Sequence, residues 1–128
     1  MIPISQADLF FTFLDQEIGI KPIWMCPVKA YNAAHQFPFF NVPSDELFIN
    51  FGYWDAVKQK TPYNYHDRLI ETKVKQLNGF KSLYSNVHYT QEEFWQIYNQ
   101  DSYQKIKQKY DPQHKLKDWY TKVTDKGN

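Results

Sequence analysis

The stretch "GFKSLYSNVHYTQEEFWQIYN", Gly79 to Asn99, contains both kinds of regular structure that define the fold. Its first half places polar side chains at every second position, which is typical of a β-strand with two different faces. Its second half carries apolar side chains at helical spacing after Thr90, and Thr90 with Glu93 has the pattern of a capping box. We therefore predict a strand followed directly by a helix. The polar row of this strand consists of Ser82, Tyr84, Asn86 and His88.

Two earlier segments also have the character of strands. "PIWMCPV", Pro22 to Val28, is short, apolar and flanked by prolines, which favours a strand at a sheet edge. "DELFINFGYW", residues 45–54, alternates cleanly and predicts a central strand, in which Gly52 allows another group to approach closely.

Helical spacing of apolar residues accounts for most of the remaining chain. Ser5 has the position of an N-terminal cap for the first helix, and Gly19 that of its C-terminal cap. Asp111-Pro112 interrupts the helical pattern near the C-terminus, and a helix start is predicted at Asp101. The element order predicts an α+β fold: one domain, residues 1–128, with an antiparallel sheet covered on one face by helices and a helical C-terminus. The predicted helices follow Ser5, span 65–77, follow Thr90 and Asp101, and include "LKDWYTKV".

Residues 29–44 form a long segment without a usable period, which predicts an irregular loop. Four aromatic side chains in such a loop are compatible with a binding or lid element, and equally with a loop that its own aromatic residues fold back on the core. These side chains are Tyr31, Phe37, Phe39 and Phe40.

Composition limits the classes of function. The chain has 128 residues, a formal net charge of +1 and 19% aromatic residues. The balanced charge argues against a nucleic-acid partner, and only 4 glycines leave no phosphate-binding loop. The four histidines are scattered, so we predict no metal site, and the single cysteine, Cys26, is expected in the core. No signal peptide or membrane-spanning pattern is visible, so we expect a soluble, cytoplasmic protein.

From the residues alone, the polar row of the predicted strand has two interpretations. It is the solvent-exposed side of a half-covered sheet, which gives the same alternation without any function. Alternatively it is a site, in which Tyr84 donates a hydrogen bond, Asn86 orients a polar group and His88 moves a proton.

Four segments together, in the same order, resemble the C-terminal part of FAD-linked oxidoreductases of the vanillyl-alcohol-oxidase type, nearest to the delta-24 sterol reductase (24-dehydrocholesterol reductase, Diminuto) branch and its bacterial relatives. They are "PIWMCPV", "DELFINFGYWD", the stretch 79–99 and "YQKIKQKYDPQHKLKDWYTKV". Asp111-Pro112 and the closing Asp118-Trp119-Tyr120 resemble the terminal signature of that family. Gln113-His114 departs from it, since related sequences often have a small residue after Asp-Pro.

The resemblance implies a ferredoxin-like half of a cap domain that covers the flavin and shapes the substrate pocket. It also implies that the N-terminal FAD-binding domain is absent from this sequence, that FAD belongs to the parent enzyme, and that a flavin-binding domain or subunit is the partner. The chain alone is then expected to bind no FAD and to be inactive. Carried over by position, the cofactor-binding residues are Lys81, Tyr84, Asn86 and His88, and the substrate-binding residues are Ser82, Asn50, Tyr31 and Phe39; no catalytic residue is assigned.

Three functions from different classes remain open. The first is the substrate-binding cap of an FAD-dependent oxidoreductase, as a fragment or split subunit, acting on a sterol-like or other alkene or alcohol substrate. The second is a separate binding module for a flat apolar ligand, motivated by the aromatic content. The third is a domain that self-associates into a homo-oligomer through an exposed sheet face.

Overall fold

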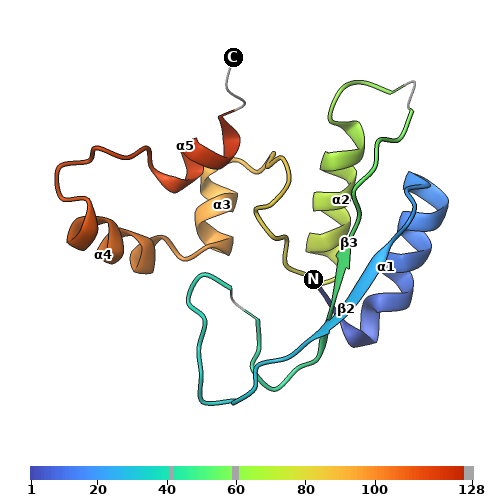
Figure 1. Ribbon diagram of the computed structural model, residues 1–128, viewed down its shortest axis with the longest axis horizontal. Helices are drawn as coiled ribbons and strands as arrows, with labels where there is room; N and C mark the ends of the chain where they lie inside the picture. The colour runs from blue at the N-terminus through green and yellow to red at the C-terminus, as the bar shows by residue number, and fades with distance from the viewer. Residues whose placement is uncertain (41, 59–60, 126–128) are drawn as a thin grey trace. The chain divides into compact units, whose positions relative to one another are not determined.

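The computed structural model describes residues 1–40, 42–58 and 61–125, which form two compact units. Unit 1 contains the described residues of Met1–His35 and Val42–Ser82, and unit 2 those of Gln36–Asn41 and Leu83–Asn128. Figure 1 labels β2 (Trp24–Val28), β3 (Phe48–Gly52), α1 (Ala7–Phe13) and α2 (Tyr65–Gln76) in unit 1. It labels α3 (Gln91–Ile97), α4 (Gln100–Tyr110) and α5 (Trp119–Thr124) in unit 2.

Unit 1 is built on a three-stranded antiparallel sheet with the order β1-β3-β2. The strands are β1 (Ile2–Pro3), β2 (Trp24–Val28) and β3 (Phe48–Gly52). Two predictions are confirmed: the strand predicted over residues 45–54, which is β3, is central, and the strand predicted over Pro22–Val28, which is β2, lies at an edge. Because proline cannot donate a ladder hydrogen bond, Pro27 suits the edge position of β2. Together with the helices, this sheet gives the predicted α+β fold.

The strand predicted over residues 79–88 is wrong, because none of these residues lies in a strand. Phe80 exchanges two backbone hydrogen bonds with Met1: the Met1 amine donates to the Phe80 carbonyl at 2.8 Å, and the Phe80 N–H donates to the Met1 carbonyl at 2.7 Å. Residues 81–90 are turn or irregular backbone. The third strand position is taken instead by β1, which pairs Ile2 with Ile49.

The first helical region begins with a 3-10 turn, η1 (Ile4–Gln6), continues as α1 (Ala7–Phe13) and ends in a π-helical turn, η2 (Leu14–Ile18). Gly19 closes it in the left-handed conformation with φ of 71°, as predicted. The predicted cap at Ser5 is wrong, because Ser5 lies within η1 and neither η1 nor α1 has a side-chain cap. The other helix of unit 1 is α2 (Tyr65–Gln76), which confirms the helix predicted there.

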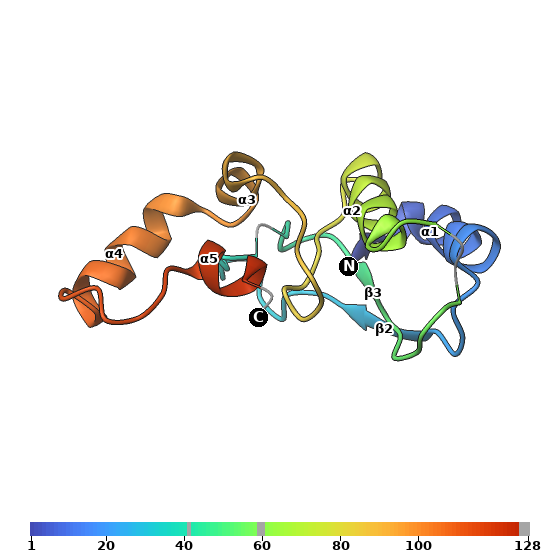
Figure 2. The same cartoon turned by 90° about the horizontal axis from the view of Figure 1, so that it is seen from above.

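The core of unit 1 lies between these helices and one face of the sheet. Figure 2 shows α1 and α2 on the same side of β2 and β3. Phe51 from β3 packs against the core, with its ring centroid 5.1 Å from that of Phe10. No helix formed by the described residues of unit 1 lies on the opposite sheet face. The buried core residues are Ile2, Phe10, Phe13, Leu14, Ile18, Ile20, Ile70, Val74 and Leu77.

Unit 2 contains three helices: α3 (Gln91–Ile97), α4 (Gln100–Tyr110) and α5 (Trp119–Thr124). The capping box predicted at Thr90 and Glu93 is present in full. The start of α4 differs from the prediction, because Asn99, rather than Asp101, caps the helix by accepting from the Ser102 N–H at 3.0 Å. The predicted break is confirmed, since α4 ends at Tyr110.

Aromatic rings form the core of unit 2. Phe94 and Tyr98 are completely buried, and their ring centroids lie 4.6 Å apart. We call the rings that pack on Phe94, together with Phe94 itself and Tyr103 beside Trp95, the aromatic cluster. Its members are Phe94, Trp95, Tyr98, Tyr103, Trp119 and Tyr120.

No helix in the described ranges has the length and the apolar character that are needed to cross a bilayer.

The pairing of Met1 with Phe80 predicts a pH-dependent stability for the 128-residue chain. Burial lowers the pKa of the Met1 amine from 8.0 to about 6. Since the folded protein disfavours the charged amine, the free energy of unfolding should rise as the pH increases from about 6 to about 8, by up to roughly 2–3 kcal/mol. Urea unfolding across this range measures the change.

The control is the chain acetylated at its amine, which keeps the N–H donor and loses the charge. The pH slope of the acetylated chain should be smaller over this interval, and equal slopes for the two forms would show that the amine does not contribute.

Candidate functional site

The sheet face opposite the helices of unit 1 carries an aromatic and uncharged surface. In the antiparallel register Trp24 pairs with Gly52 and Cys26 pairs with Asn50, so their side chains share this face. Trp54, two residues after Gly52, adds a second indole, with its ring centroid 6.4 Å from that of Trp24. We call these five residues the open sheet face. The two indoles are 49% and 70% exposed.

Gly52 is required by the packing of these two indoles. A Cβ atom at this position would lie 3.1 Å from Trp24 Cε3 and 3.1 Å from Trp54 Cη2. That separation is tighter than ordinary van der Waals contact, so a larger side chain here would displace the indoles. The predicted close approach of another group at Gly52 is therefore confirmed, and the groups are the two tryptophan rings.

Asn50 is the polar group of the open sheet face. It is half-buried on β3, and its side-chain amide makes no hydrogen bond to another described residue. An amide in that state can donate to and accept from a ligand. β2 and β3 contain no charged residue. The face therefore suits an uncharged, flat ligand with a polar edge, and it is poorly suited to a phosphate group.

Lys81, predicted to bind the cofactor, lies in the interior of unit 1. Its Nζ is 2.6 Å from Oε1 of Glu71 on α2, and the two side chains are 9% and 6% exposed. The carboxylate and the ammonium are thus paired where neither is well hydrated. The structure gives Lys81 a packing partner within its own unit, while its binding role stays a prediction.

The four residues of the predicted polar row do not lie on a strand. Ser82 is exposed at the end of unit 1, and the other three belong to unit 2. Tyr84 is 87% exposed, Asn86 is exposed and His88 is half-buried. The row as a rigid, strand-borne surface is therefore wrong, because the backbone there is turn and irregular structure.

Each of the two predicted loop residues contacts a ring of its own unit. The Tyr31 hydroxyl is 2.9 Å from Nε2 of His35, and Tyr31 is 83% exposed in unit 1. Phe39 belongs to unit 2, where it meets Trp119 edge to face at 5.5 Å. For Phe39, the interpretation of a loop anchored by its own aromatic residue is confirmed.

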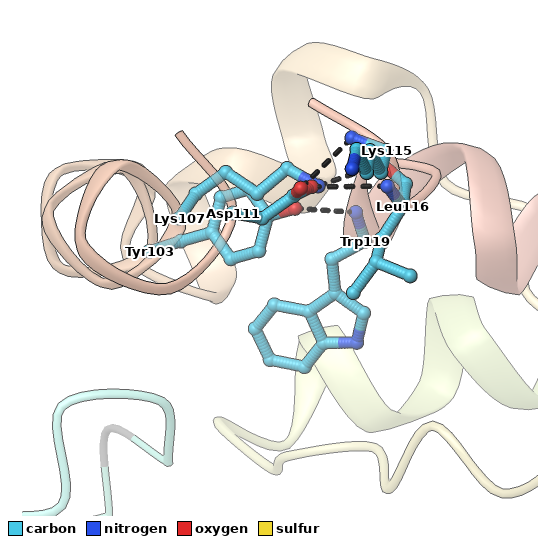
Figure 3. Close-up of polar contacts among 6 residues, drawn as sticks. All are labelled: Tyr103, Lys107, Asp111, Lys115, Leu116 and Trp119. Carbon is cyan, nitrogen blue, oxygen red and sulfur yellow. Dashed lines mark hydrogen bonds and ion pairs between the residues drawn. The ribbon is translucent and has the colours of Figure 1, made fainter. Parts of the chain in front are cut away.

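The Asp-Pro segment that carries the family resemblance organises the link between α4 and α5, as Figure 3 shows. The buried Asp111 carboxylate accepts from the backbone N–H groups of Lys115 at 2.8 Å and Leu116 at 3.0 Å, and it pairs with Lys107. Lys107 also donates to the Leu116 carbonyl at 2.7 Å. The Tyr103 hydroxyl accepts a hydrogen bond from the backbone N–H of Trp119 at 3.0 Å.

These hydrogen bonds lower the pKa of Asp111 from 3.8 to about 2, the bond from Lys107 having the largest effect, followed by that from Leu116. The carboxylate is therefore charged throughout the neutral range. Asp111 holds the loop in place and is not available as an acid or base. Among the described ranges, no group of three or more His, Cys, Asp or Glu side chains could hold a metal ion.

The geometry defines a class of molecule: an α+β chain with an uncharged sheet face in unit 1 and an aromatic, helical unit 2. Comparison with known proteins gives distant relatives. The chain is 25% identical over 125 residues to the Delta(24)-sterol reductase of Homo sapiens, covering 96% of this chain and 24% of that protein. It is 22% identical over 114 residues to the Delta(24)-sterol reductase homolog of Caenorhabditis elegans, covering 80% of this chain and 20% of that protein.

The Delta(24)-sterol reductase of Rattus norvegicus is 23% identical over 126 residues. The chain thus spans about a quarter of the length of the curated relatives it matches. No family model matches the sequence, and no solved structure matches it. The comparisons support a distant relationship to part of the sterol reductases.

The Lys81–Glu71 pair makes a prediction about stability. Lys81→Met removes the buried ammonium 2.6 Å from the Glu71 carboxylate and should lower the free energy of unfolding by about 3–5 kcal/mol. The double variant Lys81→Met/Glu71→Leu should recover most of that loss, because neither charge remains. Urea unfolding of the three proteins measures both effects.

The exposed Lys105→Met is the matched control, with an expected change within about 0.5 kcal/mol. A loss below about 1 kcal/mol for Lys81→Met would contradict a desolvated pair.

Proposed function

We propose that the chain is the substrate-binding cap of an FAD-dependent oxidoreductase of the sterol-reductase type, acting as a fragment or split subunit with a flavin-binding domain or subunit. The observation that carries the proposal is the alignment of 96% of this chain with about a quarter of the Delta(24)-sterol reductases. A sterol-like alkene or alcohol is the proposed substrate class.

The open sheet face fits this role chemically. Its lack of charge suits an uncharged ring system, and the amide of Asn50, which bonds to no other residue of the described ranges, can bond to a polar ring edge. With only 4 glycines the chain offers no glycine-rich loop for a pyrophosphate. The same division was implied by the family resemblance: the ring and the substrate meet this chain, and the phosphates are held by the partner.

In this proposal the residues of the chain bind and orient. Trp24 and Trp54 supply apolar area against a flat substrate and exclude water from it. Asn50 sets the orientation by a hydrogen bond. When bound, the flavin of the complete enzyme supplies the hydride. The proposal revises the predicted site: Asn50 remains, and the strand-borne row of Tyr84, Asn86 and His88 is replaced by residues of β2 and β3.

Reconstitution with a flavin-binding partner tests the proposal. The isolated chain is expected to purify without bound flavin. A chimera in which this chain replaces its aligned segment in a Delta(24)-sterol reductase should fold, bind FAD and reduce a sterol alkene. Asn50→Ala in that chimera should lower the rate by about tenfold or more, because the oriented hydrogen bond is lost.

Gln104→Ala, an exposed change on α4, is the matched control and should leave the rate unchanged. The cap assignment would be wrong if the isolated chain purified with about one equivalent of flavin.

A second candidate is supported by the same tryptophans. Because both indoles are well exposed, the chain could hold a flat apolar ligand without any partner. This binding-module function would need no flavin.

Titration of the isolated chain with a water-soluble sterol derivative should distinguish the two candidates. A separate binding module predicts micromolar binding, seen as a change in tryptophan emission, while a cap that needs its partner predicts binding weaker than this. Gly52→Val should abolish any such binding, because a branched side chain displaces both indoles. Gln104→Ala is again the control, and a change in emission that survives Gly52→Val would place the ligand elsewhere.

A further inference from the structure

A second surface feature, in unit 2, lies outside everything proposed above. An open groove of about 560 Å³ is lined by Gln91, Glu92, Trp95, Gln96 and Gln100. Four of these residues are on α3, and Gln100 is the first residue of α4. On a helix, residues four apart are neighbours, so Gln91 adjoins Trp95 and Glu92 adjoins Gln96. The groove thus combines one indole with three amides and one carboxylate.

The polar groups of the groove are not used by the fold. None of the three glutamine amides makes a hydrogen bond to another described residue, and neither does the carboxylate of Glu92. All four side chains are exposed. The groove therefore presents amide N–H donors, amide carbonyl acceptors and one charged acceptor group.

Trp95 is the rigid part of the groove. Its ring lies 4.9 Å from that of Tyr103, tilted by 32°, and 4.9 Å from that of Phe94, edge to face. These contacts fix the indole on the aromatic cluster while leaving it half-buried. An aromatic ring fixed in this way offers a ligand a flat apolar surface at little cost in side-chain entropy.

We propose that this groove binds a neutral polyhydroxylated ligand, of the chemical class of a saccharide. Each hydroxyl both donates and accepts, as does each amide, and the carboxylate of Glu92 can accept from two neighbouring hydroxyls. The indole suits the apolar C–H face of a pyranose ring. The lining contains no lysine or arginine, so a phosphate or carboxylate ligand would meet only the negative charge of Glu92. This complementarity selects an uncharged ligand over an anion.

The test is an NMR titration of the isotope-labelled full chain with methyl glucoside, trehalose and glucose 6-phosphate, up to about 100 mM. The proposal expects at least one neutral sugar to shift the indole N–H signal of Trp95 and the side-chain amide signals of the glutamines. Trp95→Phe identifies that indole among the four tryptophans and keeps a ring on the aromatic cluster.

Gln96→Ala/Gln100→Ala should weaken sugar binding by about fivefold or more, because two hydrogen-bonding groups are removed. Gln104→Ala, an exposed glutamine of α4 outside the groove, is the matched control and should leave the affinity unchanged. Three results would each overturn the proposal: no shift with either neutral sugar, equal affinity in the double variant, or tighter binding of the phosphorylated sugar. All three readouts are independent of flavin and of the reconstituted enzyme.

Discussion

The antiparallel contact of the first residues with both β3 and Phe80 is the interaction on which unit 1 depends. Ile2, completely buried, pairs with Ile49 on β3, while Met1 exchanges two hydrogen bonds with Phe80 after α2. A segment of very few residues therefore joins three parts of the chain that are far apart in sequence. Gly79 shows how close this packing is, since a Cβ there would lie 2.5 Å from Ile2 Cδ1. The helices can then cover one face of the sheet.

The same contact explains which parts of the fold the sequence predicted. Long periodic segments such as 45–54 and 65–77 and the cap at Thr90 carry strong local signals, and they were found. A strand of two residues is too short to show an alternation of apolar and polar side chains. The sequence therefore did not predict β1, which is recognised by its pairing with β3. The alternation of Ser82 to His88 was genuine, but a strand also needs a partner backbone. In the structure Phe80 bonds to the backbone of Met1, while residues 81–90 are turn or irregular backbone.

The sequence predicted only those residues of the candidate site whose sheet face follows from the alternation of side chains along one strand. Successive side chains of a strand point to opposite faces, so the sequence predicts Asn50 on the face opposite to that of Phe51. Gly52 was also expected to admit a close neighbour. The tryptophans at 24 and 54 were missed as site residues because their meeting depends on the register between β2 and β3. The interior ion pair of Lys81 was missed for a related reason: its partner, Glu71, lies on a different element, and charge alone does not reveal such a pair.

The distribution of charge separates structure from function in this chain. The pair formed by Lys81 and Glu71 and that formed by Lys107 and Asp111 are buried, and each holds backbone elements together. The open sheet face, by contrast, has no charge on its strands and carries the amide of Asn50, which bonds to no other residue that the structure describes. Such a surface can discriminate a flat neutral ligand by shape and by one hydrogen bond, but it cannot neutralise a phosphate. In the proposed function, the pyrophosphate of the flavin cofactor would therefore be held by a second polypeptide region, while this face meets the neutral ring or the substrate.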